Sequence, residues 1–134
     1  NVTRVQTCAL PISNIYLLQN DKTPVFVIED VCFDFNSPVI KSSFSKSLLL
    51  FVDQLKENPG VTILISGYTD DIGDYDYNVS LSYKRAESIK DFLLINGLKN
   101  KMDIKGWGSA NPIRPNNSVL NRQKNRRVEI SVKH

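Results

Sequence analysis

A carboxylate and a guanidinium stand close together in the middle of the sequence. Asp70 follows a predicted strand, and Arg85 belongs to the predicted helix that begins a few residues later. Within that helix Asn78, Ser82 and Arg85 follow the i, i+4, i+7 spacing, so they share one helix face. A carboxylate that accepts from an ammonium, beside a guanidinium that forks onto a carboxylate, suits a zwitterionic ligand. The alternative is an ion pair between Asp70 and Arg85 that ties the loop to the helix.

The start of this helix is surrounded by four aspartates: Asp70, Asp71, Asp74 and Asp76. In the EF-hand spacing counted from Asp74, Val79 stands where Gly is required, and Arg85 stands where a bidentate Glu is needed. We therefore expect no metal site and no cofactor. A solvated acidic loop that favours the positive helix N-terminus is the more common arrangement, and a looser cation site is the alternative.

Catalytic groups are sparse. The one histidine, His134, is the last residue, so no Ser–His or Cys–His pair can sit on a rigid scaffold. Cys32 lies among apolar neighbours in a predicted strand, where a thiol is usually inert. No glycine-rich phosphate loop has the required spacing. The chain is therefore predicted not to be an enzyme.

A basic stretch lies near the C-terminal end: Arg122, Lys124, Arg126 and Arg127. It contains no aromatic side chain on which a nucleic-acid base could stack. The formal net charge is only +3 over 134 residues. We therefore expect a solvated basic face and no nucleic-acid partner.

The elements that must position these residues alternate along the chain. Strands are predicted at 25–35, with an irregularity at residues 29–30, and at 61–68, 102–105 and 128–132. Helices are predicted at 44–55 and 74–96, and a short helix is predicted to start at 116–118. Gly67 inside its strand indicates a close approach by another backbone or side chain. This order predicts an α+β fold (an α/β sandwich with a βαβαββ core), in which a mixed four-stranded sheet carries two long helices on one face.

Length and composition fit one globular domain, with 41% hydrophobic and 23% charged residues. No apolar run approaches the length of about 20 residues that spans a bilayer. Residues 5–12 (VQTCALPI) resemble the translation of a sequencing-library adapter, so residues 1–12 are predicted to be a non-native leader. Residues 13–24 are predicted to be a linker or arm, and residues 25–134 the folded domain.

Several motifs, in the same order along the chain, resemble the OmpA-like C-terminal domain over about residues 25 to 133. They are FDFNS at 33–37, GYTD at 67–70 with Gly73, Asn78 with Leu81-Ser82 and Arg85-Ala86, Gly106, Gly108 and Pro112, and NRRVEI at 125–130. The resemblance implies non-catalytic binding of peptidoglycan through the diaminopimelate of its stem peptide.

The resemblance also assigns site residues. Asp70 and Arg85 match the pair that holds the amino-acid end of diaminopimelate, and Asn36 and Asn78 match positions that line the pocket. Arg126 is expected to brace the pocket rather than touch the ligand. The supporting positions are Asp34, Thr69, Gly73, Ser82 and Arg126.

The implied location is the periplasm of a Gram-negative bacterium, in association with the outer membrane. The domain would anchor an outer-membrane protein to the cell wall, and the membrane would be a partner only through an N-terminal portion that precedes this sequence. Two positions depart from the family: Ile72 stands where some members carry a Thr that contacts the ligand, and Tyr68 stands where His is common. The alternative function is a protein-interaction or assembly domain of the cell envelope that keeps the fold without binding peptidoglycan.

Overall fold

The structure is a computed structural model that describes residues 25–133. The predicted leader at 1–12, the predicted linker at 13–24 and residue 134 lie outside the described residues. No helix in the described part of the chain is long and apolar enough to cross a membrane. The elements in chain order are β1 (Val25–Glu29), the 3-10 turn η2 (Asp30–Cys32), α1 (Ser42–Leu55), β2 (Thr62–Tyr68), α2 (Tyr75–Ile95), β3 (Met102–Gly106), α3 (Val119–Asn125) and β4 (Arg127–Lys133).

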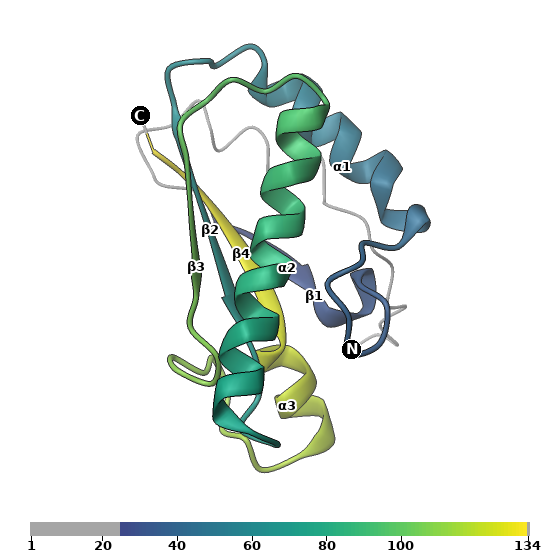
Figure 1. Ribbon diagram of the computed structural model, residues 1–134, viewed down its shortest axis with the longest axis vertical. Helices are drawn as coiled ribbons and strands as arrows, with labels where there is room; N and C mark the ends of the chain where they lie inside the picture. Colours follow the sequence, from purple (N-terminus) through teal and green to yellow (C-terminus); the bar gives the residue numbers. More distant parts are fainter. Residues whose placement is uncertain (1–24, 134) are drawn as a thin grey trace, which may run out of the picture.

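The strands form one mixed sheet in the order β1-β4-β2-β3 (Figure 1). β4 lies between β1 and β2 and is antiparallel to both, so that Ile130 is opposite Phe26 on one side and Ile65 on the other. β2 and β3 are parallel, and α2 connects them. The predicted α+β fold with a mixed four-stranded sheet is confirmed, and so is the short helix after residue 118.

Both long helices cover the same face of the sheet, and the core lies between the two layers (Figure 1). α1 buries the five residues of its predicted apolar stripe: Phe44, Leu48, Phe51, Val52 and Leu55. β4 buries its alternate residues as predicted: Val128, Ile130 and Val132. Each large apolar side chain buried in this way contributes roughly 1.5–3 kcal/mol before the conformational entropy is subtracted.

The first strand is shorter than predicted. β1 stops at Glu29, residues 30–32 form the turn η2, and Phe33 makes only an isolated bridge to residue 40. The alternation along β1 buries residues 26 and 28, so Asp30 is the next residue on the face covered by the helices. There its carboxylate meets Arg85 of α2. β1 therefore ends, and the turn begins, at the position where the charged residue Asp30 would be the next side chain on the buried face.

α2 begins and ends at the predicted residues. The side chain of Asp74 accepts a hydrogen bond of 2.8 Å from the backbone N–H three residues later, and Gly97 follows the helix with a φ of 98°. Between these ends α2 passes very close to β2. A Cβ atom on Gly67 would lie 2.0 Å from the carbonyl oxygen of Ser82, so only glycine fits there. The close approach predicted at Gly67 is confirmed, and it fixes α2 over the carboxyl end of β2, where Asp70 follows.

Candidate ligand-binding site

A cavity of about 520 Å³ lies beside the N-terminal half of α2. Its other walls come from the loop after β2, the segment after β1, and α3 with the residue that follows it. Seven of the nine predicted site residues line this cavity: Asn36, Thr69, Asp70, Gly73, Asn78, Arg85 and Arg126.

The other two predicted residues, Asp34 and Ser82, are not among the lining residues. The backbone carbonyl of Asp34 accepts a 3.5 Å hydrogen bond from Arg85 Nη2, and the residue itself is exposed. Ser82 is only 1% exposed and lies in the contact between helix and sheet. Its hydroxyl donates to the carbonyl of Val79 at 2.8 Å and accepts from the N–H of Gly108 at 3.0 Å. Its place is therefore in the packing that positions α2.

Asp70 and Arg85 line the same cavity, but they do not pair with each other. Arg85 Nη1 lies 2.5 Å from Asp30 Oδ1, and Arg126 Nη1 lies 2.7 Å from Asp70 Oδ2. Arg126 Nε contacts the second oxygen of Asp30 at 3.1 Å. The four side chains form a chain of alternating charge, Arg85–Asp30–Arg126–Asp70, in which Asp30 holds both guanidinium groups. The direct ion pair considered as an alternative is not formed.

Arg85 is held from three sides. It is 4% exposed, its Nε donates to the carbonyl of Ser37 at 2.9 Å, and its guanidinium lies 4.8 Å from the centre of the Phe33 ring. A guanidinium has five N–H groups, and the protein uses three of those of Arg85. Two donors therefore remain for a ligand at the cavity.

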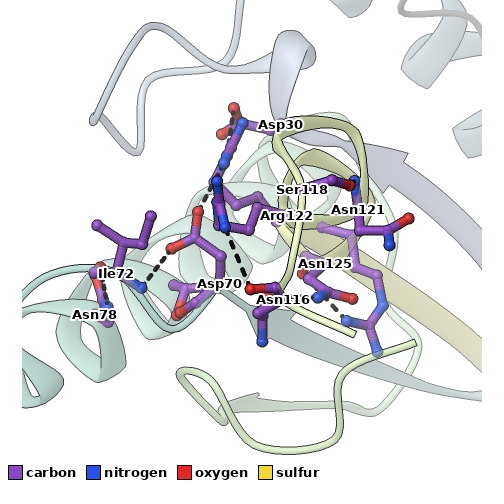
Figure 2. Close-up of polar contacts among 12 residues, drawn as sticks. Asp30, Asp70, Ile72, Asn78, Asn116, Ser118, Asn121, Arg122 and Asn125 are labelled. Atoms are coloured by element: carbon purple, nitrogen blue, oxygen red, sulfur yellow. Dashed lines mark hydrogen bonds and ion pairs between the residues drawn. The ribbon is translucent and has the colours of Figure 1, made fainter. Parts of the chain in front are cut away.

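The carboxylate of Asp70 also keeps part of its hydrogen-bonding capacity. The residue is 8% exposed, and its Oδ1 accepts from the N–H of Ile72 at 3.0 Å (Figure 2). With the contact from Arg126, two of about four acceptor positions of the carboxylate are used. The free positions can accept N–H groups of a bound ammonium.

The pKa of Arg126 is raised above its ordinary value. Burial lowers the pKa, but the hydrogen bond to Asp70 and the charge and hydrogen bond of Asp30 outweigh that effect. Arg126 therefore stays charged and, by contacting the carboxylates of Asp30 and Asp70, holds both side chains in place.

Polar contacts fix the loop that follows β2. Asn78 Nδ2 donates to the carbonyl of Ile72 at 2.9 Å, and Gly73 has a φ of 95°. The hydroxyl of Thr69 donates to the carbonyl of Asp70 at 2.8 Å. Asn36, on the opposite segment, has a φ of 48°, a left-handed conformation that Asn tolerates better than most residues. The loop that carries Asp70 is thus held from within.

The prediction of a solvated basic face near the C-terminal end is wrong. Arg122 and Arg126 line the cavity, one helical turn apart on and just after α3. Arg127 is 3% exposed, lies 3.8 Å from the centre of the Tyr68 ring and pairs with Glu129 at 2.7 Å. Asp30 and Arg122 are the charged cavity residues that the sequence-based assignment did not include. For Arg122 the signal was present, since a helix starting near 118 places residues 122 and 126 on one face.

No metal centre is formed by the described residues. Between residues 25 and 133 there is no group of three or more His, Cys, Asp or Glu side chains that could hold a metal ion. The chemistry of the cavity is that of paired carboxylates and guanidinium groups, which bind by charge and hydrogen bonds.

Comparison with known proteins points to one family. The family model described as "OmpA family" matches residues 32–126. Outer membrane protein A of Bordetella avium is 36% identical over 104 residues, which are 77% of this chain and 54% of that protein. Peptidoglycan-binding protein ArfA of Mycobacterium tuberculosis is 42% identical over 81 residues, which are 60% of this chain and 25% of that protein.

A solved structure agrees with these matches. The crystal structure of the peptidoglycan-associated lipoprotein from Burkholderia pseudomallei superposes with a TM-score of 0.71 at 28% identity, covering 80% of this chain and 89% of that one. The chain spans about half or less of the length of the curated relatives that it matches.

Proposed function

The chain belongs to the OmpA family, a family of peptidoglycan-binding and anchoring domains, and we propose that it binds peptidoglycan without catalysis, through the diaminopimelate of the stem peptide. One observation carries this proposal. Asp70 and Arg85 line one cavity without neutralising each other, so each keeps hydrogen-bonding groups for a ligand. The names of the relatives, peptidoglycan-binding and peptidoglycan-associated, support the same ligand class.

The amino-acid end of diaminopimelate carries an ammonium and a carboxylate on one carbon atom. In the proposed complex, Asp70 accepts hydrogen bonds from the ammonium and Arg85 donates its two remaining N–H groups to the carboxylate. Arg126 and Asp30 keep the two residues at their separate places. Asn36, Asn78, Thr69 and Gly73 form the surrounding wall.

We place the protein in the cell envelope, in the periplasm and associated with the outer membrane. The relatives include outer membrane proteins and a peptidoglycan-associated lipoprotein, which supports this location. A domain of this kind would anchor a longer protein to the cell wall.

Sedimentation with purified sacculi tests the proposal. Asp70→Asn keeps the shape of the side chain but removes its charge, and Arg85→Lys keeps the charge but removes the fork that reaches several acceptors. Truncating one partner of a desolvated charge pair costs about 2–5 kcal/mol of binding. We therefore expect both variants to stay in the supernatant at concentrations where the wild type sediments. Asp71→Asn, one position further and exposed, is the matched control and should sediment like the wild type.

Calorimetry with a diaminopimelate-containing muropeptide tests the ligand directly. Binding heat with the wild type, lost in Asp70→Asn, supports the proposal. If the wild type neither sediments with sacculi nor releases heat with the muropeptide, the proposal is wrong and an assembly domain of the cell envelope is the better description.

A further inference from the structure

The segment that follows β1 holds the side chain of Arg85. Within residues 25–133, that side chain makes three hydrogen bonds, and all three go to residues 30–37. The acceptors are the carboxylate of Asp30 and the backbone carbonyls of Asp34 and Ser37. The ring of Phe33, from the same segment, lies against the guanidinium. α2 therefore carries Arg85, but residues 30–37 fix the direction of its guanidinium.

The same segment forms one wall of the cavity. Asp30, Phe35 and Asn36 all line the cavity. Asp30 also reaches Arg126, so Arg85 and Arg126 share one carboxylate. If this wall moved away, both guanidinium groups would lose that carboxylate at once. Arg85, which is 4% exposed, would then be a buried charge without its partner.

β1 holds this wall at its beginning. The N–H of Asp30 donates to the carbonyl of Arg126 at 3.1 Å, which continues the antiparallel pairing of β1 with β4 by one residue. Alternate residues of such a strand direct their N–H groups to the neighbour, so those of Phe26 and Ile28 also point to β4. β1 is at an edge of the sheet and, among the described strands, it pairs with β4 alone (Figure 1). An edge strand can separate locally while the other strands stay paired.

We propose that β1 and the ligand cavity open and close as one unit, coupled through Asp30. In the closed state β1 is paired with β4 and Arg85 is held. In the open state β1 is released, residues 30–37 leave α2, and the cavity loses one wall. A ligand that binds only the closed state opposes the release of β1, and by reciprocity the release of β1 weakens binding of the ligand. The effect of the ligand rests on the proposed function, whereas the coupling of Arg85 to β1 does not.

Hydrogen exchange followed by NMR tests the coupling without any ligand. Arg85→Lys keeps the charge on α2 but loses the fork that reaches three acceptors, and it lies 55 positions from Asp30. The amides of Phe26 and Ile28 should exchange about fivefold faster or more than in the wild type. The amides of β3 should keep their rates, although α2 packs directly against β3. Arg114→Lys, the same change at an exposed side chain, is the matched control and should leave both strands unchanged.

The wild type with a saturating diaminopimelate-containing muropeptide tests the effect of the ligand. The β1 amides should exchange roughly tenfold more slowly than without it, while the amides of β3, at the other edge of the sheet, should not change. Circular dichroism should show that both variants are folded.

Two results would overturn the coupling and leave the proposed function standing. One is equal exchange of the β1 amides in Arg85→Lys and Arg114→Lys. The other is a bound muropeptide that protects β1 and β3 equally or leaves β1 unprotected. A wild type that releases no heat with the muropeptide and does not sediment with sacculi contradicts the proposed function, and the comparison of the two variants without ligand then decides the coupling.

Discussion

The carboxylate of Asp30 offers the sharpest test of how the cavity is held together. Asp30 contacts Arg85 with one oxygen and Arg126 with the other. Asp30→Asn keeps the volume and shape of the side chain, but it replaces one acceptor oxygen with an NH₂ donor. That donor then faces a guanidinium, which also carries only donors. The variant therefore loses the negative charge and at least one of the two contacts.

The expected loss of stability follows from the exposure of the three side chains. The side chain of Arg85 is 5% exposed, that of Asp30 20% and that of Arg126 32%. Removing one partner of a fully buried ion pair costs about 3–5 kcal/mol, and an exposed pair contributes only about 0.2–1 kcal/mol. Arg85 is close to the first limit and Arg126 is nearer the second. We expect Asp30→Asn to lower the free energy of unfolding by about 2–4 kcal/mol.

Urea denaturation followed by circular dichroism measures this change. Its midpoint should fall while the slope stays constant, which shows that stability has changed and the size of the transition has not. Asp34→Asn is the matched control, because it makes the same chemical change at an exposed side chain four positions away. That variant should stay within about 0.5 kcal/mol of the wild type. Equal midpoints for Asp30→Asn and Asp34→Asn would refute the bridging role of Asp30.

Three further predictions concern packing, a buried amide and a phenol. Gly67→Ala should lower the free energy of unfolding by about 1–3 kcal/mol or more, because the added Cβ atom would lie 2.0 Å from the carbonyl oxygen of Ser82. In the same urea assay, Gly60→Ala should change the free energy of unfolding little, because nothing lies within 4 Å of the added Cβ atom. Equal effects of the two substitutions would contradict the close approach at Gly67. Asn125→Ala should lower the free energy of unfolding by about 2–4 kcal/mol, because hydrogen bonds of the Asn125 side chain join the backbone of Ile113 and Arg114 to the side chain of Asn116. A thermal unfolding curve that matches the wild type would contradict this role. The pKa of Tyr68 is raised above 10.0 by burial and by the charge of Glu129, although Arg127 and a hydrogen bond from Ser66 lower it. Above pH 10.0 the unfolded chain loses this proton while the folded chain keeps it, so the free energy of unfolding should fall as the pH rises through the folded pKa. Alkaline titration of tyrosinate absorbance should show a late phase in the wild type that is missing in Tyr68→Phe, and a late phase that persists in the variant would assign the raised pKa to another tyrosine.

Local signals in the sequence were enough for most of the fold. The apolar stripe of α1, the Asp74 cap, the glycine after α2 and the alternation in β4 each depend on neighbours within one or two turns of the chain. The contact between Gly67 and α2 was also predictable, because a glycine inside an apolar strand often marks a close approach by another part of the chain.

The ion pairs of the cavity could not be predicted from residues that are close together in the sequence. Asp30 and Arg85 are 55 positions apart, and Asp30 and Arg126 are 96 apart. Nothing near Asp30 in the sequence indicates which guanidinium it pairs with, because that depends on where α2 packs on the sheet relative to the end of β1. The chemistry of Asp70 and Arg85 suggested a shared pocket, but several carboxylates could have partnered Arg85. The contacts that decide how the cavity is held are therefore tertiary.

The pairing of β1 with β4 has a mechanical consequence. β1 runs from Val25 to the turn at Asp30, which lines the cavity, so Val25 and the cavity lie at opposite ends of one strand. A force that pulls the preceding chain away from a ligand in the cavity acts along β1. Hydrogen bonds between antiparallel strands are perpendicular to the strands, so such a load is in shear and is shared by all five residue pairs of β1 and β4. Under tension the bonds must break together, and the side chains of Phe26 and Ile28 must leave the core at the same moment.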